Sequence, residues 1–321
     1  MSITRRLLPA LPLVLLAPQA GAATQSFEAF LEGVRVEARR TGVSAATVQR
    51  ALSGIRPNDR VLELDRRQPE FTQTWEQYRD ARLSQTRIDA GRRAFADNRS
   101  TLEAVQARFR VSPRVVVAIW GLETNYGGFT GNFNVIESLA TLAWDGRRSA
   151  YFRNELLAAL RILDGRHVAP ERMRGSWAGA MGHPQFMPSN FDRLAVDMDG
   201  DGRRDIWESR PDALGSIANY LARSGWREEE LWGREVTLPP GFDTSQARRD
   251  ITKPLREWVR LGVRRADGQP LPGLDLETAI LVPGAPGGQA FAVYPNFNVI
   301  RRYNPSNFYA LVVGLLSDRV A

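Results

Sequence analysis

The 321-residue chain has 43% hydrophobic and 25% charged residues, which is ordinary for a folded globular protein. Its length exceeds what one hydrophobic core usually supports, so we expect two or three packed subdomains. The absence of cysteine excludes disulfides, cysteine nucleophiles, thiolate metal sites and a lipoprotein anchor. The formal net charge of +7 predicts attraction to a polyanion, but no Lys/Arg run exceeds a dipeptide, which argues against a nucleic-acid partner.

The first residues are typical of an export signal. Arg5 and Arg6 precede an apolar run over 7–17, and small residues follow over 19–23. This order predicts a signal peptide over 1–23, because the apolar run is too short for a permanent membrane anchor. A retained membrane helix is the weaker alternative, and the sequence leaves Sec and twin-arginine export open. We therefore expect a soluble periplasmic protein after cleavage.

Helices are predicted for most of the chain that follows. Apolar residues recur every three or four positions between 27 and 81, with Gly and Pro breaks, which indicates several short helices. A longer helical pattern covers 85–109. Further helices are predicted over 113–124, 135–144, 150–163 and 212–224.

One of these helices carries a single carboxylate on its apolar face. Ser112 is a favoured N-cap, Pro113 suits the first helical position, and Gly127–Gly128 lets the chain turn away. Helical spacing places Glu123 on the same stripe as Val116, Ile119 and Trp120. Desolvation and the negative end of the helix dipole both raise the pKa of such a carboxyl, which could then donate a proton near neutral pH. The alternative is a buried Glu paired with an arginine, and this helix alone does not decide between them.

Three other segments offer groups that could contact a ligand. Small residues recur over 175–182 and allow close approach either of another helix or of a ligand, while Ser176 and Gln185 suit sugar hydroxyls and acetamido groups. Among the aromatic residues, those that keep a hydroxyl are the better ligand candidates. They are Tyr78, Tyr126 and Tyr303. Arg147 and Arg148 could bind a carboxylate in forked geometry, or they could form an exposed turn without a role.

The segment from Asp197 to Glu208 matches a calcium-binding loop at every position of the pattern. Its expected ligands are the side chains of Asp197, Asp199, Asp201, Asp205 and Glu208 and the carbonyl of Arg203. Closely spaced aspartates repel one another unless a cation neutralises them, so we expect structural Ca²⁺, or Na⁺, rather than a solvated acidic turn. A single loop without a Met-rich groove favours a structural role over calcium sensing.

The region 235–294 changes character and contains strand-like runs over 235–238, 279–282 and 290–294, with a short helix near 254–261. Asn304 and Pro305 then suggest the cap of a final helix through about residue 319. The predicted fold class is mainly α (α+β). His167 and His183 are not in zinc-ligand spacing, and no phosphate loop, dinucleotide motif or serine nucleophile elbow occurs.

Several motifs, in this order, resemble the membrane-bound lytic murein transglycosylase B family and its soluble relatives. The motifs are Gly121–Gly127, Ser176–Gly182, Gln185–Ser189, the acidic loop and Arg302–Asn304. The resemblance covers nearly all of the mature chain. It departs from the membrane-bound members by lacking a lipid-anchor cysteine, and Pro184 stands where a more flexible residue is common.

The resemblance implies a lysozyme-like core with an α-helical domain and a small β domain. It implies a carbon–oxygen lyase that cleaves the MurNAc–GlcNAc β-1,4 bond of peptidoglycan without water and forms 1,6-anhydroMurNAc. Glu123 would be the single catalytic acid and base, without a cofactor for the chemistry. Substrate positions would be Tyr78, Arg147, Arg148, Ser176, Gln185, Tyr303 and Asn304. The acidic loop would be the family's EF-hand-like metal loop.

On this basis we divide the chain into a signal peptide (1–23), an N-terminal helical region (24–84), a lysozyme-like catalytic core (85–234) that contains the loop 197–208, a β-containing subdomain (235–294) and a C-terminal helix returning to the cleft (295–321). We expect a monomer that binds peptidoglycan glycan strands, with cell-wall synthases or division proteins as candidate partners. Two alternatives remain: a muramidase that hydrolyses the same bond, for which Glu137 and Asp145 are formal second carboxylates, and an inactive peptidoglycan-binding protein.

Overall fold

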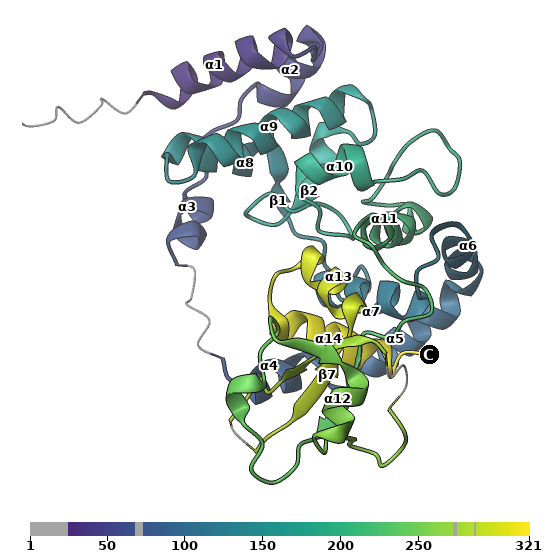
Figure 1. The fold of residues 1–321 in the computed structure, drawn as a ribbon. Helices are drawn as coiled ribbons and strands as arrows, with labels where there is room; N and C mark the ends of the chain where they lie inside the picture. Colours follow the sequence, from purple (N-terminus) through teal and green to yellow (C-terminus); the bar gives the residue numbers. More distant parts are fainter. Residues whose placement is uncertain (1–24, 68–72, 272–274, 286) are drawn as a thin grey trace, which may run out of the picture.

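A computed structural model describes residues 25–67, 73–271, 275–285 and 287–321. The predicted signal peptide and the predicted break at Pro69 lie outside these ranges. The described residues form fourteen α-helices, a five-stranded sheet and a two-stranded sheet (Figure 1). The predicted mainly α fold with a small β part is therefore confirmed. None of the described helices combines the length and apolarity needed to cross a membrane.

The first of three hydrophobic cores joins the N-terminal helices to the middle of the chain. It packs α1 (Phe27–Arg40), α2 (Ala45–Leu52), α3 (Asp59–Arg66), α8 (Val135–Asp145), α9 (Ser149–Asp164) and α10 (Pro188–Leu194). Ser26, Ser44, Asn58 and Asn134 cap α1, α2, α3 and α8 by accepting a backbone N–H. In Figure 1 these helices form the upper part of the molecule.

The second core surrounds α7 (Pro113–Thr124), whose residues from Val115 to Gly121 are all buried. Around it lie α4 (Trp75–Arg82), α5 (Gln85–Asp97), α6 (Arg99–Phe109), α11 (Arg210–Arg223), α13 (Pro295–Tyr303) and α14 (Asn307–Ser317). A helix that is apolar on every side must be enclosed by other elements. The last helix of the chain therefore packs directly on α7, far away in sequence.

The five-stranded sheet is antiparallel throughout and has the order β4-β6-β7-β3-β5. Its strands are β3 (Gly233–Thr237), β4 (Thr252–Pro254), β5 (Arg264–Arg265), β6 (Glu277–Leu281) and β7 (Ala290–Val293). Alternate residues point to opposite faces: Phe291 and Val293 join the second core, whereas Ala290 and Ala292 join a third core with α12 (Leu255–Arg260). The sheet is thus covered on both faces, which explains its apolar central strands.

The helices differ from the sequence predictions in two places, and several short strands were not predicted. The single helix expected over 85–109 is two helices that meet at Asn98, whose side-chain amide donates to the Ala94 carbonyl. The C-terminal helix is also two, and its second part is capped by Ser306 rather than by Asn304. The short strands β4 and β5, and the pair β1 (Phe133–Asn134) and β2 (Arg174–Gly175), gave no recognisable sequence pattern.

Candidate active site

Glu123 is the penultimate residue of α7 and lies where the first and second cores meet. The helix ends because Asn125 and Tyr126 adopt left-handed backbone conformations, with φ of 51° and 59°. The glycines at 127–128 predict a turn there, so the chain turns two residues earlier than predicted. Glu123 is half-buried, while the helix that precedes it is enclosed.

The carboxyl of Glu123 contacts a phenol from the far end of the chain. Tyr309 on α14 donates from Oη to Oε1 of Glu123 at 2.6 Å. Burial raises the pKa of Glu123 to about 7, and the hydrogen bond from Tyr309 opposes that rise. No arginine among the described residues forms an ion pair with Glu123, so the Glu–Arg alternative is not supported. The group can therefore exchange a proton near neutral pH.

Two further tyrosines lie near the same carboxyl. Burial raises the pKa of Tyr78, Tyr303 and Tyr309, and the charge of Glu123 raises each further. Tyr303 donates from Oη to the Pro184 carbonyl at 2.6 Å, and so connects α13 to the segment after β2. Tyr78 packs its ring under the guanidinium of Arg82, 3.6 Å from the ring centroid. Tyr78 and Tyr303, both predicted site residues, are thus brought to Glu123.

Tyr126, the third predicted hydroxyl, has a structural role. Its Oη donates to the Arg87 carbonyl at 3.0 Å, and its ring packs so closely on α7 that a Cβ at Gly121 would lie 2.4 Å from it. The hydroxyl therefore holds the turn after α7 against α5.

The small residues of 175–182 serve close packing rather than an open surface. Met181 pairs with both Gly175 and Phe186, and a Cβ at Gly175 would lie 2.2 Å from the Ala180 carbonyl. Ser176 lies in this segment, where its Oγ accepts the Ala180 N–H at 3.0 Å. The packing interpretation thus accounts for the glycines, although Ser176 itself is only half-buried.

Gln185 and Asn304 flank the Tyr303–Pro184 contact along the chain. Gln185 has a left-handed φ of 52°, and its Nε2 donates to the carbonyls of Thr130 and Gly182 at 3.0 and 2.9 Å. Asn304 follows α13 and accepts the Ser306 N–H at 3.2 Å. Both amides therefore shape the backbone around Tyr303.

Arg147 and Arg148 occupy the turn between α8 and α9, next to α3. Both form ion pairs with Asp65, whose side chain is almost wholly buried. Glu137 and Asp145, the two carboxylates considered as catalytic partners of Glu123, also contact α3 or its cap. Glu137 accepts a hydrogen bond from Asn58, and Asp145 pairs with Arg66. The structure therefore does not place these four groups in contact with Glu123.

The acidic loop gathers three of its predicted ligands with one that sequence analysis missed. Carboxylate oxygens of Asp197, Asp199, Asp201 and Asp212 lie within 4.8 Å of one another. Asp212 lies in the first turn of α11 and also accepts the N–H groups of Met198 and Asp205, each at 2.7 Å. An all-oxygen donor set of this kind suits a hard cation such as Ca²⁺.

The carboxylates of Asp205 and Glu208, which are also predicted ligands, are not part of that cluster. Asp205 accepts the N–H groups of Trp207 and Glu208, each at 3.0 Å, and Glu208 pairs with Arg172. The Arg203 side chain pairs with Asp201 at 2.8 Å.

Comparison with known proteins gives the class of enzyme. Residues 26–318 match the family described as Transglycosylase SLT domain. Membrane-bound lytic murein transglycosylase B of Escherichia coli is 30% identical over 295 residues, covering 87% of this chain and 79% of that protein. The chain therefore belongs to the transglycosylase SLT family, in its lytic murein transglycosylase B branch, and is a lytic transglycosylase.

Two solved structures are similar over most of the chain. SltB3 from Pseudomonas aeruginosa, in complex with NAG-NAM-pentapeptide, is 48% identical with a TM-score of 0.90, covering 92% of this chain and 80% of that chain. Slt35 from Escherichia coli, in complex with calcium, is 29% identical with a TM-score of 0.76, covering 91% and 92%. These likenesses confirm the lysozyme-like transglycosylase fold that the motifs implied.

Proposed function

We propose that Glu123 is the single acid and base with which this lytic transglycosylase cleaves the MurNAc–GlcNAc β-1,4 bond of peptidoglycan. The observation that carries the proposal is the half-buried carboxyl with a pKa of about 7, hydrogen-bonded to Tyr309. A group with that pKa is present in both protonation states at neutral pH. It can therefore serve both half-reactions of one cycle.

In the first step the protonated Glu123 donates its proton to the glycosidic oxygen as the C1–O bond breaks and the GlcNAc-side product leaves. The electron deficiency at C1 of MurNAc is carried by its ring oxygen or acetamido group. The Glu123 carboxylate then removes the proton of the C6 hydroxyl on the same sugar. That oxygen forms a bond to C1, which closes the 1,6-anhydro ring without water and restores the protonated acid.

The residues around Glu123 supply the proposed binding surface. The phenols of Tyr78 and Tyr303 lie near the acid. Asn304 follows Tyr303 in the chain, Gln185 follows its hydrogen-bond partner Pro184, and Ser176 lies in the preceding segment, so that all three would offer neutral polar groups. Arg147 and Arg148 would meet stem-peptide carboxylates in competition with Asp65, their present partner. SltB3, crystallised with a NAG-NAM-pentapeptide, supports a glycan with its peptide as the ligand.

Glu123→Gln tests the proposal because it keeps the shape and removes the proton. Acid–base catalysis contributes roughly 10²–10⁴-fold, so solubilisation of sacculi should fall by about that factor while glycan binding survives. Mass spectrometry of the wild-type products should find anhydro ends. Reducing ends, heavier by one water, would identify a muramidase instead. Binding of sacculi by the wild-type protein without any release would identify an inactive binding protein.

We further propose that the acidic loop holds Ca²⁺ or Na⁺ as a structural cation and that the mature protein works in the periplasm as a monomer. The cluster formed by Asp197, Asp199, Asp201 and Asp212 supports the cation, as does the calcium complex of Slt35. The full set of ligands from the sequence pattern would add the Arg203 carbonyl and the side chains of Asp205 and Glu208. To bind the cation, Asp205 would have to release the N–H groups of Trp207 and Glu208, and Glu208 would have to release Arg172. The export pattern of 1–23 supports the location.

A further inference from the structure

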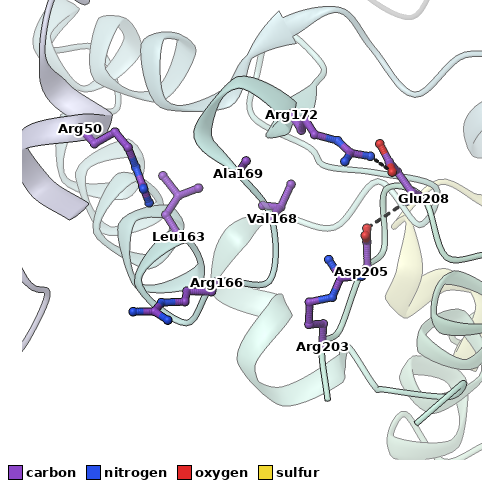
Figure 2. A pocket seen from close by; sticks show the side chains of 9 residues that line it. All are labelled: Arg50, Leu163, Arg166, Val168, Ala169, Arg172, Arg203, Asp205 and Glu208. Atoms are coloured by element: carbon purple, nitrogen blue, oxygen red, sulfur yellow. Dashed lines mark hydrogen bonds and ion pairs between the residues drawn. The ribbon is translucent and has the colours of Figure 1, made fainter. Parts of the chain in front are cut away.

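A hollow of about 420 Å³ lies between α2, the turn after α9 and the end of the acidic loop (Figure 2). It includes none of the residues that contact Glu123. Four arginines line it, with two carboxylates and three apolar residues. The arginines are Arg50, Arg166, Arg172 and Arg203. Such a concentration of guanidinium groups around one space favours an anionic ligand.

The two sides of the hollow differ in charge balance. On one side Arg172 pairs with Glu208, and Arg203 pairs with Asp201. On the other side, neither Arg50 nor Arg166 has an ion-pair partner within 4.0 Å among the described residues. The pKa of Asp164 is lowered first by a hydrogen bond from Ser44, and the charge of Arg166 helps to lower it. Figure 2 shows these two arginines across the hollow from the Arg172–Glu208 pair. The arginines without an ion-pair partner therefore lie at one end of the space.

Arg166 follows α9 in the left-handed conformation that commonly ends a helix. Its φ is 58°, and its N–H donates to the Leu163 carbonyl at 3.0 Å, while Gly165 before it has an ordinary φ of −69°. The end of α9 therefore fixes the backbone from which the Arg166 side chain lines the hollow.

The floor between the two ends is apolar. Leu163, Val168 and Ala169 separate the unpaired arginines from the Asp205–Glu208 end. A matching ligand has a carboxylate for the unpaired arginines and a short apolar stretch beside it. The carboxylate end of a peptide has this chemistry.

We propose that this hollow binds the carboxylate end of a peptidoglycan stem peptide, as a second contact with the wall apart from Glu123. The inference rests on the proposed function for its choice of occupant. An oxyanion such as phosphate shares the chemistry that the arginines recognise, and the experiment separates the two sources.

The experiment measures binding of the synthetic stem tripeptide L-Ala-D-Glu-meso-diaminopimelate to the mature protein by calorimetry at low salt. The test variant is Arg50→Ala with Arg166→Ala. The matched control is Arg93→Ala with Arg99→Ala, which removes the same charge from two exposed arginines outside the hollow. A second comparison is the double variant Arg147→Ala with Arg148→Ala. These two arginines lie in the turn between α8 and α9 and are the stem-peptide contacts of the proposed function. Thermal melting confirms that each variant folds.

The expected result is a loss of tripeptide affinity of at least about tenfold in the Arg50/Arg166 variant, with little change in the control, because each guanidinium–carboxylate contact is charge-assisted. Loss only in the Arg147/Arg148 variant would overturn the proposal, as would an equal loss in the control. Binding of inorganic phosphate without the tripeptide would overturn the peptide assignment. The tripeptide has no glycosidic bond, so these outcomes do not depend on the Glu123 chemistry, which the product analysis tests separately.

Discussion

At the scale of single residues, the reactivity of Glu123 is a balance between two opposing influences. Burial disfavours the carboxylate and raises the pKa of Glu123, whereas the Tyr309 phenol stabilises the carboxylate and limits the rise to about 7. The protonated form is needed to break the glycosidic bond, and the carboxylate is needed to close the anhydro ring. The phenol therefore adjusts the acid to the pH at which both forms are available.

Tyr309→Phe removes this hydrogen bond with little change in shape. We expect the pKa of Glu123 to rise further, because burial still raises it and the hydrogen bond that lowers it is gone. The alkaline limb of the kcat/KM profile, which reports loss of the proton from the free enzyme, should then move to higher pH. The profile is measured by release of soluble muropeptides between pH 5 and 9.

Tyr126→Phe is the control for that experiment, because the Tyr126 hydroxyl bonds to a backbone carbonyl and not to Glu123. An alkaline limb that stays in place in Tyr309→Phe would show that the contact does not set the acidity of Glu123.

At the scale of elements, the position of Glu123 depends on close packing between α7 and the turn that follows it. The ring of Tyr126 occupies the space where a Cβ at Gly121 would lie, and its hydroxyl is tied to the Arg87 carbonyl. The glycine is thus required by the close approach of the Tyr126 ring to the helix, although glycine weakens helices in general.

Gly121→Ala should destabilise the protein by about 1–3 kcal/mol, because overpacking outweighs the gain in helix propensity. Gly33→Ala in α1 is the matched control, since the nearest atom to its added Cβ is a flexible arginine nitrogen at 3.5 Å. That variant should be neutral or slightly more stable. Urea unfolding measures both, and equal behaviour of the two variants would contradict the packing argument.

The acidic loop is likewise attached to a helix, because Asp212 of α11 accepts hydrogen bonds from the N–H groups of Met198 and Asp205 in the loop. A cation bound among its carboxylates should stabilise the folded protein by about 2.7 kcal/mol at a hundredfold excess over the dissociation constant. We expect calcium to raise the melting temperature and a chelator to reverse the rise.

Asp201→Asn should weaken this response while leaving the Asp212 contacts in place. A melting temperature that is the same with calcium and with chelator would show that no structural cation stabilises the loop.

At the scale of the whole molecule, the raised pKa of Glu123 is a cost to folding. The unfolded carboxyl titrates near 4.5 and the folded one near 7, so the folded state binds its proton more tightly. Stability is therefore highest below pH 4.5 with respect to this group, and falls as the pH rises to 7. The full cost is roughly 3 kcal/mol above pH 7.

Glu123→Gln has no such titration and should gain stability relative to the wild type as the pH rises. Guanidinium unfolding at pH 4.5 and pH 8 measures the difference, with the exposed Glu103→Gln as control. A wild-type–variant difference that is the same at both pH values would show that Glu123 titrates alike in the folded and unfolded chains.

Local signals in the sequence were enough to predict the helix of Glu123, the three longer strands of the sheet (β3, β6 and β7) and three aspartates of the acidic cluster. Contacts between distant segments gave no local signal: Tyr78 and Tyr303 are assigned to the cleft only through the family resemblance, and nothing near Glu123 indicates that Tyr309 will reach it. Tyr309 could have been noticed as a polar group in the apolar helix 307–317, by the same argument that selected Glu123. Asp212 could have been noticed as the acid three residues after the N-cap Ser209.

The contact between Glu123 and Tyr309 also has a consequence for how the site is assembled. The two side chains are 186 positions apart and belong to α7 and α14. Closing a loop of that length costs chain entropy, which the packing of the two helices must offset. The acidity of Glu123 therefore depends on long-range folding, because a chain in which α14 has not docked on α7 lacks this hydrogen bond.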